Sequence, residues 1–263
     1  MIKFFRHIRQ TLLMENKTSK YFKYAIGEIL LVVIGILIAL QINTWNQERV
    51  NAREERRILQ DLSKELRFNN FLKEKGSRVM QEVVDAADRL LLVINNQTEQ
   101  RDTSQIGMYL HKLTWVWVSG RNTTIYDVLS GSGDFDNISS SVLRKKLADL
   151  KANQENLLQF EVVQNQFVDQ QLRPFLNRAI DRTTMRSKFE TGEMITTMHA
   201  SKFPNSYSEL LESREFANLL VDLDFFTRRV LGTYGRIDRD ITQIDSLIQS
   251  KYPDIVAKVY TPY

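Results

Sequence analysis

The sequence contains no cysteine, and only three of its 263 residues are histidine. Without cysteine there is no disulfide bond, no thiolate zinc site and no thiol nucleophile, which is compatible with an oxidising compartment. His7, His111 and His199 complete neither a Glu-x-x-His pair nor a His-Glu-x-x-His motif, two patterns that hold metals on helices. We therefore predict no catalytic residue, no metal and no cofactor, and we expect that the protein is not an enzyme.

Proline and glycine are also scarce, with four and ten residues respectively. Both residues interrupt helices, so a chain with few of them can form long ones. The fold class that we predict is all-α: an N-terminal transmembrane helix followed by an antiparallel helical bundle with long, coiled-coil-like helices.

The segment "KYFKYAIGEILLVVIGILIALQINTWNQ" holds the longest apolar run. Within residues 25–42 the strongly polar side chains are Glu28 and Gln41, and no polar stripe recurs at helical spacing. Eighteen residues of helix cover about 27 Å, close to the roughly 30 Å of a bilayer's hydrocarbon core. The C-terminal end of the apolar run lacks the pair of small residues at which an export signal is cleaved. We predict an uncleaved transmembrane anchor over residues 24–46 in place of a signal peptide or a buried core helix.

Four residues of the anchor are candidates for contact with the membrane or with a partner. Glu28 lies about one turn inside the helix, where its carboxylate can reach the interface; the alternative is that it pairs with a partner subunit or moves protons. Gly35 and Ala39 form a small-xxx-small pair that lets two helices approach. Trp45 stands where indole rings favour the headgroup region.

Residues 1–23 form a basic arm that we predict to be an amphipathic, cytoplasmic helix at the membrane surface. The arm and Tyr24 together carry six basic residues and one acid, so the rest of the chain has a net charge of −1 out of the total of +4. We expect the basic side chains to bind lipid headgroups and expect no nucleic acid as a partner. These side chains are Lys3, Arg6, Arg9, Lys17, Lys20 and Lys23.

Basic residues directly before the anchor favour a cytoplasmic N-terminus. The expected location is therefore the inner (plasma) membrane, crossed once, with residues 47–263 as a periplasmic helical bundle. Apolar residues at spacings of three and four predict helices over 47–94, 104–118 and from Ser139 or Ser140 to about 172, where Pro174 ends or kinks the helix. Residues 181–205 are expected to be a loop.

The last helix has the clearest pattern, an apolar seam that either builds the bundle's own core or forms a dimer interface. The seam runs through Phe216, Leu220, Leu223, Phe226, Val230, Tyr234, Ile237, Ile241, Ile244 and Ile248.

Three further features were considered as sites. The stretch "GSGDFDN" follows a predicted helix, not a strand, and lacks the glycine and glutamate spacing of a calcium loop, so it predicts a turn in which Gly131 and Gly133 supply positive φ angles. His111 and Trp115, four residues apart, form either a pocket or part of the core. Arg121 and Asp127 form either a salt bridge or part of an active site.

The N-terminal sequence also resembles a family. Tyr24 to Ile29, Val32 to Asn43 and Trp45 with Asn46 read like the signature of single-pass proteins of flavobacteria grouped as domain-of-unknown-function family 6090. The segment "TIYDVLSGSGDFDNIS" resembles the family more loosely. This resemblance implies the anchor, a bacterial envelope setting and the bundle, but it implies no activity.

Together these features lead us to expect a single-pass envelope protein of unknown activity, a non-catalytic scaffold, sensor or protein-binding bundle. Its expected partners are the membrane and either a second copy of the chain or another envelope protein. The alternative is a membrane-tethered enzyme or small-ligand-binding protein with Arg121, Asp127 and His111 around a cleft beside the loop 181–205. A further alternative is an accessory subunit of a membrane complex that uses Glu28.

Overall fold

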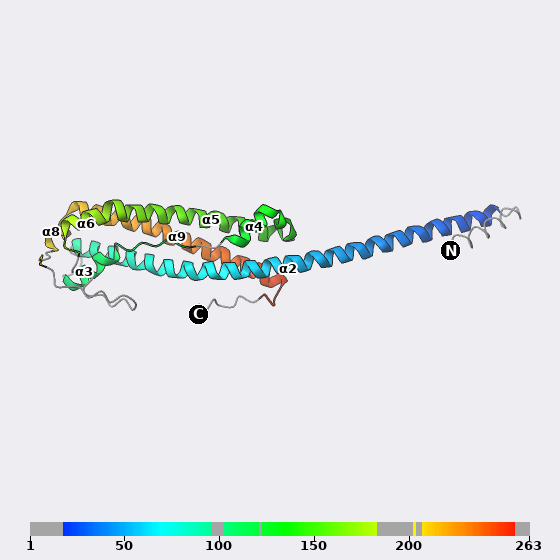
Figure 1. Ribbon diagram of the computed structural model, residues 1–263, viewed down its shortest axis with the longest axis horizontal. Helices are drawn as coiled ribbons and strands as arrows, with labels where there is room; N and C mark the ends of the chain where they lie inside the picture. The colour runs from blue at the N-terminus through cyan, green and yellow to red at the C-terminus, as the bar shows by residue number, and fades with distance from the viewer. Residues whose placement is uncertain (1–17, 96–102, 121–122, 183–201, 204–206, 256–263) are drawn as a thin grey trace. The chain divides into compact units, whose positions relative to one another are not determined.

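The computed structural model describes residues 18–95, 103–120, 123–182, 202–203 and 207–255. These residues form helices and connecting segments without any strand, which confirms the all-α prediction (Figure 1). The elements in order are α2 (Thr18–Ile94), α3 (Thr103–Lys112), α4 (Thr124–Ser132), η1 (Asp134–Asn137), α5 (Ser141–Phe167), η2 (Val168–Leu172), α6 (Arg173–Ala179), α8 (Ser208–Leu211) and α9 (Arg214–Lys251).

The chain divides into two compact units, Met1–Arg57 and Ile58–Tyr263, and the division falls within α2. In the first unit every side chain from Ile29 to Val50 is exposed. The second unit holds the remainder of α2 and all later helices.

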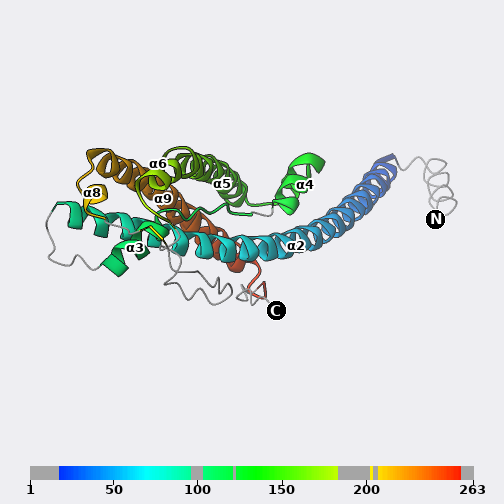
Figure 2. The ribbon, with the colours of Figure 1, turned by 60° about the vertical axis from the view of Figure 1, so that its left-hand side comes forward.

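The second unit is an antiparallel bundle of three long helices: α2 from Ile58 onward, α5 and α9 (Figure 2). Two ion pairs join α2 to α9, Lys73 with Asp238 and Asp88 with Arg228. Residue numbers rise along α2 while they fall along α9, so the two helices run in opposite directions. Helices α5 and α9 also run in opposite directions, because Asn153 binds Asp240 and, further along α5, Glu161 binds the earlier residue Tyr234 of α9.

The apolar seam of α9 lies in the core of this bundle. Phe216, Leu220, Val230 and Ile244 are fully buried, and the other seam residues are buried apart from Phe226, which is half-buried. Burial within a single chain confirms that the seam builds the bundle's own core.

The predicted helix over 104–118 is wrong in its second half. Helix α3 ends at Lys112, and residues 115–120 have no regular secondary structure. Side chains of α5 and α6 bind two carbonyls here: Arg173 donates to the Thr114 carbonyl at 2.7 Å, and Asn165 donates to the Trp117 carbonyl at 3.2 Å. We call residues 114–120 the strap, since they run along α5 in the opposite direction to it.

The turns around α4 follow the predicted chemistry in part. Gly133 adopts a positive φ of 80°, whereas Gly131 lies inside α4 and does not. The stretch "GSGDFDN" forms the predicted turn: it ends α4 and continues into the 3-10 element η1, where Phe135 packs on Tyr126 with ring centroids 5.2 Å apart. Ser140 caps α5 by accepting a hydrogen bond from the Leu143 N–H at 3.2 Å.

Pro174 perturbs the long helix as expected. Between Phe167 and Arg173 the helix widens into the π-helical turn η2, and the Arg173 N–H bonds to the Val168 carbonyl. Proline has no N–H and its ring clashes with the carbonyl four residues earlier, so the wider turn allows the helix to continue into α6. The predicted loop 181–205 lies mostly outside the described residues.

A buried carboxylate ties α4 to α2. The Glu65 side chain accepts a hydrogen bond from the Ile125 N–H at 2.7 Å, at the start of α4. Burial raises the pKa of Glu65 above its ordinary value of 4.5, although the backbone hydrogen bonds oppose this.

We expect Glu65→Gln to flatten the dependence of stability on pH. Because the folded pKa is raised, the contribution of Glu65 is fully present below pH 4.5 and is lost as pH rises through the folded value. The melting temperature of the wild type should therefore fall relative to that of Glu65→Gln as pH increases from 4.5 to neutral. Circular dichroism on detergent-solubilised protein measures this, with Glu74→Gln on the exposed side of α2 as the control. A difference that stays constant with pH would contradict the assignment.

Candidate functional site

The structure places the predicted membrane-contact residues on α2. The apolar side chains between residues 29 and 42 are between 46% and 64% exposed. Gly35 has open space where a Cβ would stand, Ala39 is exposed, and Glu28 is half-buried. Trp45 is 60% exposed, with the Arg49 guanidinium 5.9 Å from the centroid of its ring. These residues present an apolar surface that the first unit itself does not cover.

The predicted headgroup-binding residues are described only in part. Lys23 is exposed. Lys3, Arg6, Arg9 and Lys17 lie outside the described residues, and Lys20 belongs to α2 but its side chain is not described.

The residues weighed for an active site belong to different elements. His111 lies in α3 and its ring meets Trp115 edge-on at 6.0 Å, but Trp115 follows the end of the helix. Asp127 in α4 binds Lys151 at 2.7 Å. Arg121 lies outside the described residues. Among the residues that the structure describes, no group of histidine and carboxylate side chains could hold a metal ion.

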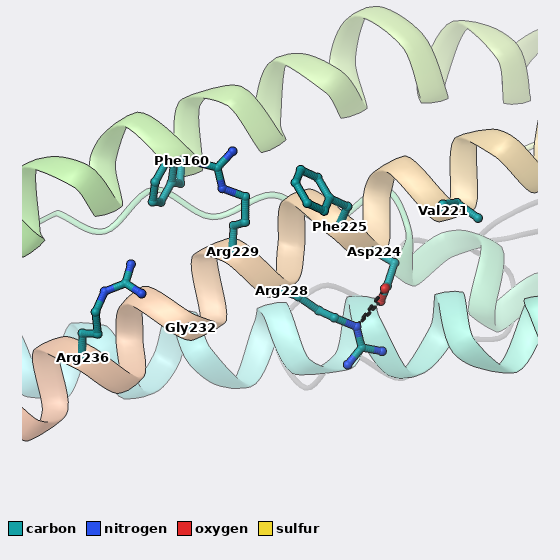
Figure 3. Close-up of a pocket in the computed structure, with 8 residues that line it drawn as sticks. All are labelled: Phe160, Val221, Asp224, Phe225, Arg228, Arg229, Gly232 and Arg236. Atoms are coloured by element: carbon teal, nitrogen blue, oxygen red, sulfur yellow. Dashed lines mark hydrogen bonds and ion pairs between the residues drawn. The ribbon is translucent and has the colours of Figure 1, made fainter.

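A groove of about 710 Å³ runs along the outer face of α9, beside α5 (Figure 3). Helix α5 contributes one aromatic side chain and α9 contributes the other lining residues, three of which are arginines. The lining consists of Phe160, Val221, Asp224, Phe225, Arg228, Arg229, Gly232 and Arg236.

Arg229 lies between the aromatic side chains of the groove. Its guanidinium carbon is 4.2 Å from the centroid of the Phe160 ring and 5.7 Å from that of Phe225. Such stacking holds the plane of a guanidinium while its N–H groups remain able to donate. Arg236 donates to the Thr233 hydroxyl at 2.6 Å.

Arg228 points away from Arg229 and towards α2, where it is held by two carboxylates (Figure 3). It donates to Asp224 at 2.8 Å and to Asp88 at 2.8 and 2.9 Å. The hydrogen bonds that Arg228 donates to Asp224, and then those that it donates to Asp88, raise its pKa further above its ordinary value. Asp224, the acidic residue that lines the groove, is therefore already paired with Arg228.

Behind the groove, a buried carboxylate joins three elements. Glu161 of α5 is 1% exposed, and its Oε1 accepts from the Tyr234 hydroxyl at 2.6 Å. Its Oε2 accepts from the backbone N–H of Ser119 at 3.0 Å and from the Ser119 hydroxyl at 2.9 Å. Burial, and then the Glu161 carboxylate, raise the pKa of Tyr234 above its ordinary value, so the hydroxyl stays protonated and donates. This cluster fixes the strap against α5 and α9.

Gly76 of α2 makes the same cluster possible by its lack of a side chain. A Cβ at this position would lie 2.5 Å from Nε1 and 2.7 Å from Cδ1 of Trp117, and would also collide with the Tyr234 hydroxyl. The indole of the strap therefore lies directly against the helix backbone.

We expect Gly76→Ala to destabilise the protein by about 1 to 3 kcal/mol, since rigid aromatic groups must move to admit the methyl group. The gain in helix propensity, up to about 1 kcal/mol, only partly offsets this. Thermal unfolding measures the change, and Gly235→Ala in α9 is the control because its Cβ would meet only the end of Arg239 at 4.0 Å. A Gly76→Ala variant as stable as Gly235→Ala would contradict the close approach.

Neither the groove nor the Glu161 cluster was predicted from the sequence. One signal was available for the groove, because Val221, Phe225, Arg229 and Arg236 recur at helical spacing opposite the seam of α9. The partners of Glu161 lie 42 and 73 residues away in sequence, and no local pattern joins them.

Comparison with known proteins gives one family. Residues 28–158 match the sequence model described as "Family of unknown function (DUF6090)". This match supports the family resemblance from Glu28 of α2 onward, through α3 and α4 and over the first part of α5. No curated protein and no solved structure matches the chain.

Proposed function

From a family match that brings no activity, we propose that this chain is a single-pass, membrane-anchored envelope protein whose helical bundle binds another protein without catalysis. The observation that carries the proposal is the apolar segment of α2. One helix in the described part of the chain is long and apolar enough to cross a membrane, and none of its most apolar stretch is buried. Exposed apolar area on this scale marks a membrane or protein contact.

The flanks of the segment support the proposed orientation. The six basic residues before it favour a cytoplasmic N-terminus, and residues 47–263 then lie on the periplasmic side of the inner membrane. The open space at Gly35 and the exposed Ala39 suit contact with a second transmembrane helix, either of another copy or of an envelope partner.

The bundle supports binding in preference to catalysis. In the described part of the bundle, the groove on α9 combines exposed apolar side chains with arginines, a composition that is common at protein interfaces. Among the charged groups of the groove, Asp224 pairs with Arg228, Arg229 stacks on aromatic rings and Arg236 donates to the Thr233 hydroxyl.

Fractionation combined with a topology reporter tests the proposal. The full-length protein should remain in carbonate-washed membranes and be released only by detergent. A periplasm-active reporter enzyme fused after residue 255 should be active, and the same reporter fused before residue 1 should be inactive. Recovery of the chain in the aqueous fraction, or the opposite reporter pattern, would refute the anchor or the orientation respectively.

A further inference from the structure

Helix α9 carries a stripe on the face opposite its buried seam. Val221, Phe225, Arg229, Gly232 and Arg236 follow one another at intervals of four, four, three and four residues, which places them on one side of the helix. All five are exposed, with Val221 and Phe225 each at 56%. The stripe is apolar at its N-terminal end and cationic towards its C-terminal end (Figure 3).

Gly232 is not explained by packing inside the protein. It lies in the interior of α9, where glycine is a poor helix former, and a Cβ built there meets no atom within 4 Å. Gly76 differs, because there a side chain would collide with Trp117. The missing side chain at Gly232 leaves the floor of the groove flat between Arg229 and Arg236, so that an approaching molecule can touch the helix backbone.

The groove has an excess of positive charge on its exposed side. Asp224 is bound by Arg228, which also binds Asp88. Among the described residues, Arg229 and Arg236 form no ion pair with a carboxylate, and Arg229 is held by stacking between two rings. A held guanidinium without a carboxylate partner is suited to bidentate binding of an anion.

We propose that this groove binds an acidic segment of a partner protein. An apolar side chain of that segment packs on Val221 and Phe225, its backbone passes close to Gly232, and its carboxylates bind Arg229 and Arg236. The stripe from Val221 to Arg236 is about 22 Å long at the rise of an α-helix, which matches a peptide of several turns and exceeds a single lipid headgroup. This inference rests on the proposed function and deepens it, because it names the chemistry of the partner.

A peptide array on the full-length, detergent-solubilised protein tests the inference. The array holds helical peptides of about 18 residues, each with two large apolar residues one turn apart and Asp or Glu two to three turns further on. Every peptide has a counterpart in which Asn or Gln replaces the acids. Acidic peptides should bind at least roughly tenfold more tightly than their amide counterparts, and the preference should weaken with salt.

Two arginine pairs separate the groove from general electrostatics. Arg229→Gln with Arg236→Gln should weaken binding of the acidic peptides by at least roughly tenfold. Arg78→Gln with Arg89→Gln, which removes two exposed arginines of α2 outside the groove, should leave binding within about twofold of the wild type. Equal losses for the two pairs would overturn the assignment.

The glycine variants separate binding from folding. Gly232→Ala should raise the melting temperature by roughly 2 to 4 °C while it weakens peptide binding. Gly235→Ala, three residues further along α9 and outside the groove, should raise the melting temperature without weakening binding. Gly232→Ala with unchanged binding would show that the backbone is not approached.

Two more outcomes overturn the inference without touching the anchor. The first is that no acidic peptide exceeds its amide counterpart. The second is that vesicles of phosphatidylglycerol bind the wild type and lose binding in the Arg229→Gln/Arg236→Gln variant, which would assign the groove to lipid. In either case, membrane fractionation and the reporter fusions still report separately on the proposed function.

Discussion

Replacing both Ile34 and Leu37 with arginine is expected to abolish the proposed anchoring of the protein in the membrane. Residues 25–42 contain twelve Leu, Ile and Val residues. Each favours insertion by roughly 0.3 to 0.6 kcal/mol, so together they contribute about 4 to 7 kcal/mol. Two central arginines oppose insertion by about 5 to 7 kcal/mol and also remove two apolar residues. The balance then no longer favours the bilayer.

The same arithmetic predicts that one arginine is tolerated. Ile34→Arg alone opposes insertion by about 3 kcal/mol, which is less than the apolar residues supply, so this variant should stay in carbonate-washed membranes. Ile34→Ala with Leu37→Ala is the matched control for the double variant, because it shortens the same side chains without adding charge. Flotation on a density gradient distinguishes membrane-bound protein from aggregates. If the double arginine variant floats with the membranes, the anchor does not lie at residues 25–42.

Replacing Glu161 with alanine should have the largest effect on the bundle, a loss of about 3 to 5 kcal/mol in the free energy of unfolding. The change leaves the buried Tyr234 hydroxyl and both donors of the half-buried Ser119 without their acceptor. Each buried donor without a partner costs about 1 to 3 kcal/mol. At roughly 2 to 4 °C per kcal/mol, the melting temperature should fall by about 6 to 20 °C.

Single substitutions of the two residues that donate to Glu161 show how much each hydrogen bond contributes. Tyr234→Phe and Ser119→Ala each remove one hydroxyl but leave the Glu161 carboxylate with its other hydrogen bonds, so each should cost about 1 to 2 kcal/mol. A double variant, Glu161→Ala with Tyr234→Phe, should be less destabilised than the sum of the two single changes, because the tyrosine no longer carries an unpaired hydroxyl. Additive losses would contradict the direct hydrogen bond.

The parts of the fold that sequence patterns predicted are those fixed by local periodicity. The seam of α9 and the run through α2 have apolar residues every three or four positions, and burial of one face then determines both helices. The cap at Ser140 and the perturbation at Pro174 were predictable for the same reason, because each depends on the backbone within one turn.

The strap was not predictable from its own residues. Its start, in "LTWVWV", continues a helical pattern, yet the backbone from Thr114 to Ser119 leaves the helix because Arg173, Asn165 and Glu161 bind its carbonyl and N–H groups. These three side chains lie between 42 and 59 residues further along the chain. Tertiary hydrogen bonds thus overrode a weak local preference.

The groove escaped the sequence analysis for a different reason. Recognisable site motifs are built from histidine, carboxylate and glycine residues, whereas arginine and aromatic residues dominate the groove, on the outer face of a helix whose apolar pattern marks its inner face. Phe160 joins it only because α5 packs beside α9, a register that the sequence does not contain.

The Glu161 cluster, which holds the strap, also affects where the chain can be truncated. The family match stops at residue 158, two residues before Phe160 and three before Glu161, and it omits α9 entirely. A fragment cut at that boundary would keep Ser119 and Gly76 but lose the acceptor and the tyrosine that they meet, and its longest apolar faces would be left bare. The stretch that the family model matches therefore lacks the α9 side chains that complete the core of the bundle, and truncation series should place their C-terminal limit beyond Lys251.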